Sequence, residues 1–579
     1  LHRQRQMCIR DRLNIDNLSL KDQKTFELLQ RGETTAIFQL ESKGMRDYLK
    51  QLIPNDFEDI VSMNALYRPG ALGMNMVDSY INRKHGKEEV TYGHESVKKI
   101  LGTTYGVIVY QEQVMQIAQE LSGFSLGQAD ILRRAMGKKK KEEMESLRST
   151  FVDGAVKKDV NERYAANLFD QIEQFAGYGF NRSHSVGYAL IAYQTAWLKA
   201  HYPAEFMASV LSCDLGNTDN IQLFVDDCKN IGLTVLSPDI NQSSYKFENP
   251  NNKTILYGLG AIKGIGESLV DKIISEREEE KFKDMYDFCL RVGFKRINRR
   301  ILTTLIGSGA MDALGKRQDL FARIDSCLKN AEQASERDKS NIRDLFGEEI
   351  ITPEINEIDE EVEFDEVSAE WSALGFYLDS HPLENKKKEV RNMCGFFISE
   401  LQSETHNQRI SGCLIQFNVR SGRRGRFAFA TLDDGSGKIE VSIWADAFEK
   451  YRNLLKKGQV LVVEGMVEKD AYSDSQRHKM IAERILTFDQ ARREFVKNIK
   501  IDIEDSANTK DIVGSLKEIA NSDDGNLVLI SYKGNTAKAD IVLPKNFSVN
   551  LDDSSIKALD KRFGAENVEF VYHSQIHIN

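Results

Sequence analysis

The hydrophobic side chains change their spacing along this chain, and this change limits the folds that the chain can adopt. From Leu13 to about Leu215 they recur with the period of an α-helix, as at positions 114, 117, 118 and 121. Between about 409 and 486 they alternate with polar residues, which predicts strands at 426–432, 438–444 and 460–467. At roughly 150 residues a domain, the 579 residues form about four domains. The pattern predicts a multidomain α+β protein that is mainly helical before a β-barrel and a small α+β C-terminal domain.

Composition excludes several protein classes. With 41% hydrophobic residues and only 8 prolines, the chain is neither fibrous nor disordered. No stretch reaches the roughly 20 apolar residues of a membrane helix, so no membrane partner is expected. The 7 cysteines lie far apart and form no CxxC pair, which argues against a zinc ribbon or a disulfide scaffold. A reducing, cytoplasmic location is predicted.

Charge is segregated along the chain. The net charge of −10 disfavours a nucleic-acid partner, yet six of the nine residues from Arg133 to Lys141 are basic. Two smaller basic clusters lie at 295–300 and 420–426, whereas Glu348 to Glu366 holds ten acids and no base. Such clusters fit phosphate binding at defined sites, and solvated helix faces are the alternative.

Several boundaries follow from these shifts. Residues 1–12 contain four arginines without apolar periodicity and are predicted to be a foreign, tag-like or disordered extension. Helices are expected to begin near Ser125, Ser183 and Pro203. Short helices and glycine turns follow from about 216 to 335, and 347–368 is an acidic linker. Strands at 498–503, 527–532 and 539–542 indicate the C-terminal unit.

The segment Gly177-Tyr-Gly-Phe-Asn-Arg-Ser-His-Ser185 precedes a long apolar helix. Asn181 or Ser183 can cap this helix, whose free N–H groups together with Arg182 form a candidate anion site. An ordinary glycine-rich loop before a capped helix fits the spacing as well, and His184 alone fits a structural histidine.

Adjacent arginines, Arg133 and Arg134, stand near a helix end before Lys138 and three further lysines. Planar, permanently charged guanidinium groups suit the spread charge of a triphosphate. A solvated basic helix end is the alternative.

The segment Ala261-Ile-Lys-Gly-Ile-Gly-Glu-Ser-Leu-Val270 is typical of a helix–hairpin–helix. In that motif hairpin amides at Gly264 and Gly266 bind a DNA phosphate, and Lys263 adds charge without base readout. A plain glycine turn is the alternative. The segment from Asn298 to Ala310, which contains Arg299 and Arg300, is a candidate for a second, degenerate copy.

The strands between 409 and 486 predict a five-stranded OB barrel that binds single strands through basic and aromatic residues. Candidates are Arg424, Arg426, Phe427, Phe429 and Trp444, although alternation also allows the two phenylalanines to be core residues. The sequence contains no HExxH, P-loop or GxSxG motif, so neither a catalytic residue nor a metal ligand is assigned.

Taken together, these segments resemble the alpha subunits of bacterial DNA polymerase III, which are C-family replicative polymerases. The resemblance runs from about Lys21 to the C-terminus. Its most specific segments are Glu33-Thr-Thr-Ala-Ile-Phe-Gln-Leu-Glu-Ser42, Tyr67-Arg-Pro-Gly70, Tyr110-Gln-Glu-Gln-Val114, Leu132–Lys140, Phe175–Tyr193 and Tyr202-Pro-Ala-Glu-Phe206.

The resemblance implies a domain order. Residues 13–215 correspond to the polymerase fingers with palm-adjacent chain, and 216–346 to a clamp-binding region with tandem helix–hairpin–helix units. A connecting helical segment at 369–404 leads to the OB domain at 405–490. Residues 491–579 resemble the domain that meets the clamp-loader tau subunit.

The resemblance also implies roles for residues. Arg133 and Arg134 match the fingers arginines that contact the triphosphate of the incoming nucleotide, and His184 matches the histidine that senses the sugar and excludes the 2′-OH. Ile342-Arg-Asp-Leu-Phe346 matches the internal motif for the beta sliding clamp. Asp344, Leu345 and Phe346 fit it, whereas Ile342 replaces the expected glutamine.

The family's three palm aspartates hold two Mg²⁺ ions, and neither of their two motifs occurs in this sequence. The PHP domain is not found either. We therefore expect a C-terminal portion of the polymerase that binds primer–template DNA and deoxynucleoside triphosphates without the catalytic metal site. The alternatives are a non-enzymatic DNA-binding scaffold and an error-prone paralogue of the alpha subunit.

Overall fold

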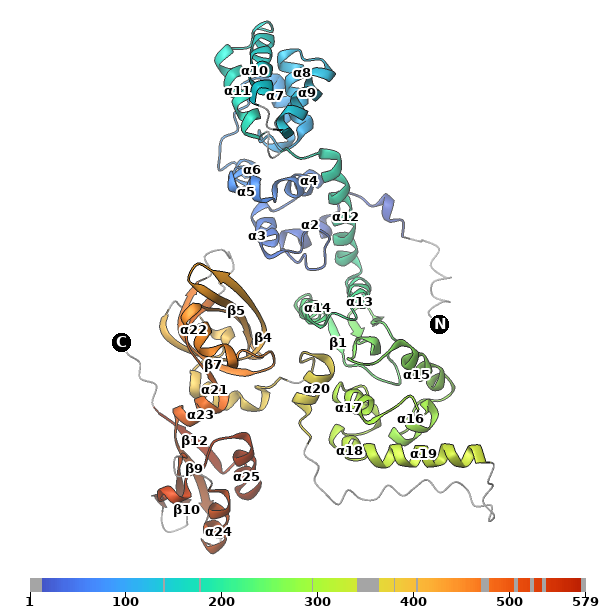
Figure 1. Ribbon diagram of the computed structural model, residues 1–579, viewed down its shortest axis with the longest axis vertical. Coiled ribbons are helices and arrows are strands. Elements are labelled where there is room, and N and C mark those ends of the chain that lie inside the picture. Colours follow the sequence, from blue (N-terminus) through green and yellow to red (C-terminus); the bar gives the residue numbers. More distant parts are fainter. Residues whose placement is uncertain are drawn as a thin grey trace. The chain divides into compact units, whose positions relative to one another are not determined.

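The protein is described here by a computed structural model (Figure 1). The described residues are 13–138, 141–175, 179–293, 295–340, 364–379, 381–401, 405–469, 478–504, 509–520, 525–533 and 538–573. The chain divides into two compact units. The first comprises Leu1–Pro238 and Gln242–Ala261, and the second comprises Asp239–Asn241 and Ile262–Asn579.

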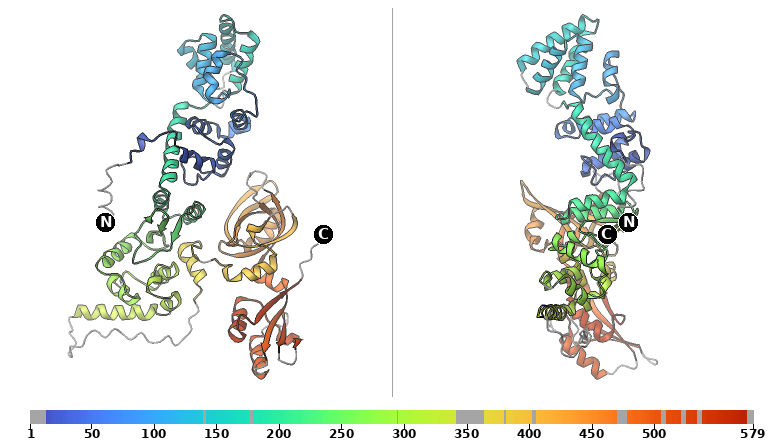
Figure 2. Two further views of the ribbon diagram at one scale, coloured as in Figure 1. Left: turned by 180° about the vertical axis from the view of Figure 1, so that it is seen from behind. Right: turned by 90° about the vertical axis from the view of Figure 1, so that its right-hand side faces the viewer.

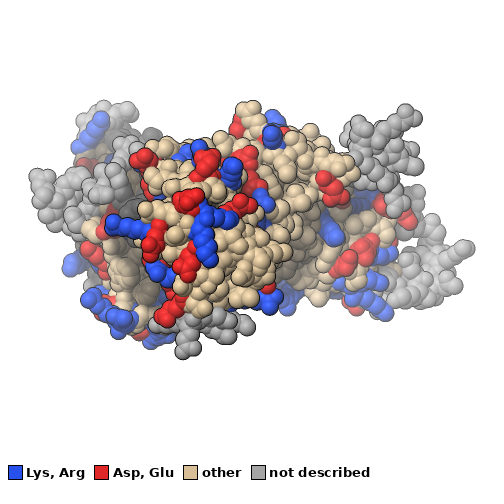
Figure 3. Space-filling model, turned by 90° about the horizontal axis from the view of Figure 1, so that it is seen from above, with Lys and Arg blue, Asp and Glu red and all other residues tan. Residues whose placement is uncertain are grey.

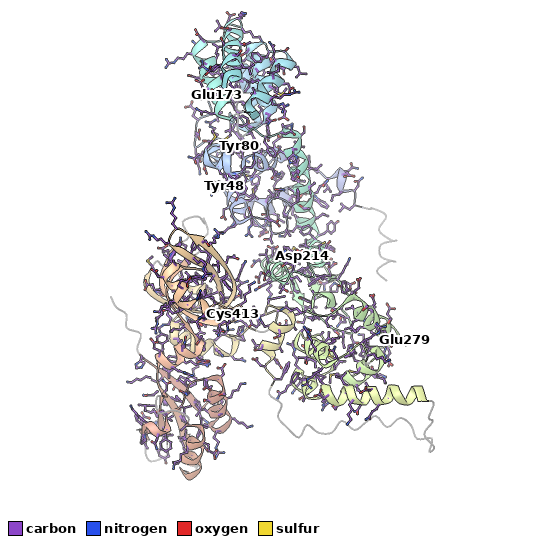
Figure 4. All side chains as sticks on the ribbon, viewed as in Figure 1. Tyr48, Tyr80, Glu173, Asp214, Glu279 and Cys413 are labelled. Atoms are coloured by element: carbon purple, nitrogen blue, oxygen red, sulfur yellow. The ribbon has the colours of Figure 1, made fainter. Side chains whose placement is uncertain are left out.

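The first unit begins with a helical layer whose core includes one face of the later helix α12 (Arg182–His201). Asp59 is buried there, where it accepts a hydrogen bond from Tyr80 and pairs with Lys84. Burial raises the pKa of Tyr80, which Figure 4 marks within this layer. The helices are α2 (Gln23–Gln30), α3 (Lys43–Leu52), α4 (Phe57–Leu66), α5 (Pro69–Gly73) and α6 (Met76–Lys84).

A second group of helices has a separate core. Val114, Ile117 and Leu121 are buried in it, so the predicted helical period is confirmed. Gly154 allows two of these helices to approach, because a Cβ there would lie 2.1 Å from the Ser122 carbonyl oxygen. The helices are α7 (Glu95–Leu101), α8 (Gln111–Ser122), α9 (Leu126–Lys138), α10 (Lys141–Val156) and α11 (Glu162–Phe175).

Helix α12 connects the two groups. It lies along α2 and α4 in all three ribbon views (Figures 1 and 2), and a bridge pairs Tyr110 with Phe180 just before its start. Helix α13 (Pro203–Cys213) begins at the predicted proline, and α14 (Thr218–Asn230) follows.

A small sheet closes this unit and was not predicted. It has the order β1-β3-β2, with β1 (Thr234–Leu236) parallel to β3 (Thr254–Leu256) and β2 (Glu248–Asn251) antiparallel to β3. Strands of three or four residues are too short to show an alternating pattern, which explains why sequence analysis missed them.

The second unit starts with the predicted short helices. They are α15 (Glu267–Glu279), α16 (Met285–Val292), α17 (Arg299–Gly307), α18 (Arg317–Ala322) and α19 (Ile324–Ser340). Helix α20 (Glu366–Leu374) packs against α17 where a Cβ on Gly307 would come within 2.8 Å of the Ala369 carbonyl oxygen. The predicted linker thus ends inside a helix, and its part up to 363 lies outside the described residues.

The predicted barrel is confirmed as a closed sheet with the order β4-β5-β6-β8-β7. Asp434 shapes the predicted turn at 433–437 by accepting hydrogen bonds from the N–H groups of Ser436 and Gly437. Helix α21 (Lys387–Cys394) precedes the barrel, and α22 (Ala445–Tyr451) joins its third and fourth strands, as in OB folds. The strands are β4 (Thr405–Gly422), β5 (Gly425–Asp433), β6 (Lys438–Ile443), β7 (Val460–Lys469) and β8 (His478–Thr487).

The last part of the second unit is the expected small α+β domain. Its sheet has the order β11-β10-β9-β12, and α24 joins the parallel strands β9 and β10. Buried Arg492 lies before it and binds Glu389 and Asp553, which ties α21, α23 and α25 together. The elements are α23 (Phe488–Phe495), β9 (Val496–Glu504), α24 (Thr509–Ile519), β10 (Leu527–Lys533), β11 (Lys538–Val542), α25 (Asp553–Phe563) and β12 (Val568–Tyr572).

Within the described ranges, every helix is too short or too polar to cross a lipid bilayer.

Candidate nucleic-acid interface

The two adjacent arginines of α9 share one carboxylate. Ser125 and Gln128 cap the start of the helix reciprocally, and buried Ala129, Leu132 and Ala135 orient it. Asp130, Arg133 and Arg134 lie on the outer side. The Asp130 Oδ1 atom lies 2.8 Å from Arg133 Nη2, and its Oδ2 atom lies 2.7 Å from Arg134 Nη2. The hydrogen bond from Arg133 lowers the pKa of Asp130, so this carboxylate stays ionised and neutralises part of the cluster. Lys138 ends α9, and its side chain lies outside the described part.

The start of α12 already holds an anionic group from the protein itself. Asn181 caps the helix by accepting a hydrogen bond from the His184 N–H at 2.8 Å. Both carboxylate oxygens of Glu112 accept the Arg182 N–H, at 3.1 and 3.0 Å, while the Arg182 guanidinium group lies 2.7 Å from Glu58 Oε1. The sequence predicted an anion site here with free N–H groups. In the structure Glu112 is that anion, because the positive end of the helix dipole attracts an acid from the neighbouring helix.

The His184 ring is exposed to solvent and lies in a row of aromatic rings. Its centroid lies 4.3 Å from that of Tyr188, one turn along the helix, and 5.5 Å from that of Phe180. Among the described residues, neither arginine of α9 contacts Arg182 or His184. The predicted nucleotide-binding residues therefore lie in two separate places, with Arg133 and Arg134 on α9 and Arg182 and His184 at the start of α12.

The two glycines of the first hairpin are exposed to solvent. Gly264 has φ +78°, a left-handed conformation that favours glycine, and a Cβ at either Gly264 or Gly266 would meet no atom within 4 Å. Gly266 caps α15 without a side-chain hydrogen bond. The backbone N–H of Lys263 donates a hydrogen bond to the Ala373 carbonyl oxygen, and partial burial lowers the pKa of the Lys263 side chain. The segment before the hairpin is a 3₁₀ turn (Leu259–Ala261), where an α-helix was expected.

The start of the candidate second copy is more restricted. Asn298 caps α17, and Arg299 forms an ion pair with Asp325 and lies over the Phe321 ring. Arg300 is exposed at the start of the same helix. The first hairpin is thus the more accessible of the two for a phosphate group.

The barrel has an aromatic cluster on its outer face. Phe427, Phe429 and Trp444 contact one another with ring centroids 5.5 to 6.3 Å apart, and Trp444 is 49% exposed. Ala428 and Ala430, which alternate with the phenylalanines along β5, are buried. The phenylalanines therefore face outward and are not core residues.

Arginines surround this cluster on β4 and β5. The Arg420 guanidinium group lies 5.5 Å from the Phe429 ring, and Arg426 pairs with Glu449 at 3.2 Å. Arg424 lies exposed at the turn between the strands. This arrangement of stacking surfaces beside cations is the chemistry that binds single-stranded nucleic acid.

The proposed clamp motif, with Ile342, Asp344, Leu345 and Phe346, lies outside the described residues. In the described part of the chain, no group of three His, Cys, Asp or Glu side chains is arranged to hold a metal ion. Basic and acidic side chains are interspersed over the face seen in Figure 3.

Sequence reasoning missed the acids that hold the arginines. Asp130 was detectable, because spacings of three and four residues place it beside Arg133 and Arg134 on a helix. Glu58 and Glu112 reach Arg182 only through the tertiary fold.

Comparisons with known proteins match the order of these regions. The family model of the bacterial DNA polymerase III alpha subunit finger domain matches residues 2–159. Models of the helix-hairpin-helix motif and the OB-fold nucleic acid binding domain match residues 232–320 and 410–487.

Curated relatives extend the match to nearly the whole chain. The DNA polymerase III subunit alpha of Escherichia coli strain K12 is 41% identical over 97% of this chain and 50% of its own length. Those of Vibrio cholerae and Pseudomonas aeruginosa are 40% and 39% identical over the same shares. The chain therefore spans about half the length of the curated relatives it matches.

Proposed function

Since this chain belongs to the family of DNA polymerase III alpha subunits, we propose that it forms the nucleotide- and DNA-binding part of a replicative DNA-directed DNA polymerase. The intact enzyme adds deoxynucleotides to a primer 3′ end and releases pyrophosphate. The observation that carries the proposal is the order of finger, hairpin and OB segments within one chain. Primer–template DNA and deoxynucleoside triphosphates are its proposed substrates, and the cytoplasmic location predicted from the sequence belongs to the same proposal.

The nucleotide contacts are assigned to the fingers. Arg133 and Arg134, joined through Asp130, present two guanidinium groups on one side of α9, and Lys138 lies one turn further along the helix. Planar guanidinium groups donate several hydrogen bonds to phosphate oxygens, which suits a triphosphate. Arg182 and His184 are assigned to the sugar and phosphate of a nucleotide at α12.

The DNA contacts are assigned to the second unit. Gly264 and Gly266 are exposed and leave room for the close approach of a DNA phosphate, with Lys263, Arg299 and Arg300 adding positive charge. The aromatic cluster of the barrel, with Arg424 and Arg426, suits an unpaired strand such as the single-stranded template.

Mg²⁺ supplies charge stabilisation in polymerases of this kind. The described residues do not fit it, because they include no cluster of three potential ligands. We assign no catalytic residue and derive no metal-dependent step from this chain. The metal-binding aspartates are proposed to lie in the half of the alpha subunit that the 579 residues do not match.

The protein partners are proposed on sequence grounds. Leu345 and Phe346 would be the hydrophobic anchors for the beta sliding clamp, and the domain from 491 to 579 is proposed to bind the clamp-loader tau subunit. Phe346→Ala is expected to weaken clamp binding by roughly tenfold or more, the usual scale for a buried aromatic anchor. Fluorescence titration with labelled clamp measures the change, and equal affinities of the two proteins would contradict the assignment.

Nucleotide binding tests the central proposal. Equilibrium dialysis with dATP should show binding to the 579-residue chain, and Arg133→Ala with Arg134→Ala should weaken it by at least about tenfold. Arg148→Ala is the matched control, because it removes an arginine whose acidic partner, Asp170, lies in the same group of helices. Wild-type protein that binds neither dATP nor primed DNA would overturn the proposal.

A gel shift and a primer-extension assay complete the test. We expect binding of a primed template without extension when Mg²⁺ and all four deoxynucleotides are present. Extension would contradict our placing of the metal ligands outside this chain. DNA binding without any dATP binding would favour the second candidate function, a non-enzymatic DNA-binding scaffold, for which the hairpins and the barrel are sufficient.

A further inference from the structure

Aromatic side chains from two distant segments form a continuous row beside His184. The Phe38 ring lies 5.4 Å from that of Tyr188, and the Tyr188 ring lies 4.3 Å from that of His184. Phe180 continues the row at 5.5 Å from His184. Three of these rings belong to α12 or the residues just before it, whereas Phe38 comes from the loop between α2 and α3.

The loop that carries Phe38 has a strained backbone. Ala36 and Gln39 have φ values of 61° and 64°, in the left-handed region that non-glycine residues rarely occupy. Such strain persists where the surrounding structure holds it in place, and it is concentrated at functional sites.

Several buried hydrogen bonds hold this loop. The Lys199 ammonium group donates to the carbonyl oxygens of Glu33 and Thr35, each at 2.9 Å. The Thr34 hydroxyl donates to the Leu40 carbonyl oxygen at 2.6 Å. The neighbours of Phe38 on the inner side, Ile37 and Leu40, are fully buried, while Phe38 itself is 37% exposed. These buried contacts therefore hold the loop in place on both sides of Phe38, while the Phe38 ring itself is partly exposed.

Two arginines lie near one end of this row, and one of them, Arg182, also pairs with Glu58. Arg182 lies at the start of α12, two residues before His184, and Arg68 has its guanidinium group 4.3 Å from the Phe180 ring. The row thus offers ring surfaces at one end and cations at the other. Nucleobases stack on such rings whatever their sequence, since every base has a π face.

Resting on the proposed function, we propose that Phe38 and Tyr188 extend the sugar contact of His184 into a stacking surface for a nucleobase. Phe38 is then a base-contacting residue that lies 146 positions before His184 in the sequence. The base belongs either to the bound deoxynucleoside triphosphate or to a DNA strand, and the two sources share the same stacking chemistry.

The fluorescence of 2-aminopurine, which stacking quenches, tests this surface. One arm uses 2-aminopurine deoxyribonucleoside triphosphate, and the other uses a single-stranded oligonucleotide with one 2-aminopurine. The oligonucleotide arm is measured in a Phe429→Ala, Trp444→Ala background, so that the barrel's aromatic cluster does not contribute. Quenching in the first arm alone identifies the nucleotide as the source of the base, and quenching in the second identifies the strand.

Phe38→Leu keeps an apolar side chain but removes the ring, and it should lose most of the quenching and roughly tenfold in affinity. Phe38→Tyr should retain both. Tyr188→Leu removes the neighbouring ring from the other segment and should reproduce the loss if Phe38→Leu disturbs folding. Leu223→Ala, an exposed apolar position on α14, is the matched control.

Normal affinity and quenching in both leucine variants, with wild-type binding intact, would overturn the stacking surface and leave the proposed function standing. Failure of the wild-type chain to bind either probe would overturn the proposed function and this inference together.

Discussion

The arginines of α9 and α12 and those at the turn between β4 and β5 have different surroundings. In α9 and α12, Arg133, Arg134 and Arg182 each pair with a carboxylate of the protein. At the turn between β4 and β5, by contrast, Arg423 and Arg424 have no acidic partner within the described residues. Among the described residues, these arginines of α9 and α12 therefore have acidic partners, whereas the two at this turn of the barrel have none.

These different surroundings of the arginines favour different ligands. A ligand of the fingers must compete with resident carboxylates for guanidinium donors, which favours a compact ligand of high negative charge such as a triphosphate. The barrel has exposed rings and arginines that have no acidic partner among the described residues, an arrangement that favours an unpaired strand with little sequence preference. Four experiments test this difference.

The first experiment concerns Lys199 on α12, which forms a buried ion pair in the first unit. Its side chain is 0% exposed and pairs with Asp227 at 2.7 Å. Lys199→Met leaves a buried carboxylate unpaired, so we expect the first unit to lose about 3–5 kcal/mol of unfolding free energy. Urea denaturation followed by hydrogen exchange measures the loss and its location.

Arg31→Met is the matched control, because the exposed Arg31–Glu33 pair should contribute no more than about 1 kcal/mol. Equal destabilisation by both variants would show that burial of the Lys199 pair does not matter. Loss of protection in the barrel as well would show that the two regions are not independent.

The second experiment removes stacking from the barrel. Phe429→Ala combined with Trp444→Ala should lower the affinity for a labelled single-stranded oligonucleotide by about a hundredfold, because each stacked base contributes roughly 1–3 kcal/mol. Fluorescence anisotropy measures the affinity. Val419→Ala, an exposed position on β4 that pairs with buried Ala428, should have no effect. Weaker dATP binding by the double variant would contradict the assignment of nucleotide binding to α9 and α12 and of strand binding to the barrel.

The third experiment removes the acid that the two fingers arginines share. Asp130→Asn should tighten the binding of inorganic tripolyphosphate by about fivefold to tenfold at low salt, because it removes a competing negative charge a few ångströms away. Isothermal titration calorimetry measures the change. Asp153→Asn takes the same charge from an exposed position on α10 and should not change the affinity. Weaker binding by Asp130→Asn would mean that Asp130 mainly orients the arginines.

The fourth experiment concerns the cysteines, whose reactivity reports on packing in both regions. Burial raises the pKa of Cys228 in the first unit and of Cys413 in the barrel to about 12, whereas Cys213 is exposed. Figure 4 marks Cys413 on the barrel. A raised pKa keeps a thiol protonated at pH 8, so these two thiols should react with a disulfide reagent at least about a thousandfold more slowly than a free cysteine.

Ellman-type titration in a Cys8→Ser background should therefore show one fast thiol, which Cys213→Ser removes. Urea should expose the others. Fast reaction of Cys413 in the native protein would show that the barrel opens readily.

Local patterns predicted much of the fold. The strands expected at 426–432 and 460–467 appear as β5 and β7, and the helix expected at Pro203 begins there. These elements were accessible because backbone hydrogen bonding fixes the spacing of side chains within a segment. The hairpin at Gly264 was recognised for the same reason, although the turn before it proved to be a 3₁₀ turn.

The candidate sites were only half predictable. Sequence identified Arg133, Arg134, Arg182 and His184 as candidates, and their roles stay predictions. Alternation placed Phe427 and Phe429 on one side of a strand, but only closure of the barrel decided that this side faces solvent. The predicted clamp motif and the domain limits remain untested by the fold.

The order of helical and β regions, the hairpin glycines and the family could be read from the residues alone, since each depends on residues close together in the chain or on long matching segments. Tertiary structure alone decided which acids meet Arg182, that Lys199 holds the loop of Phe38, and that the Phe38 ring joins Tyr188 and His184. Those contacts join residues more than 50 positions apart. They form only when the packing of whole helices repays the entropy of closing such long loops.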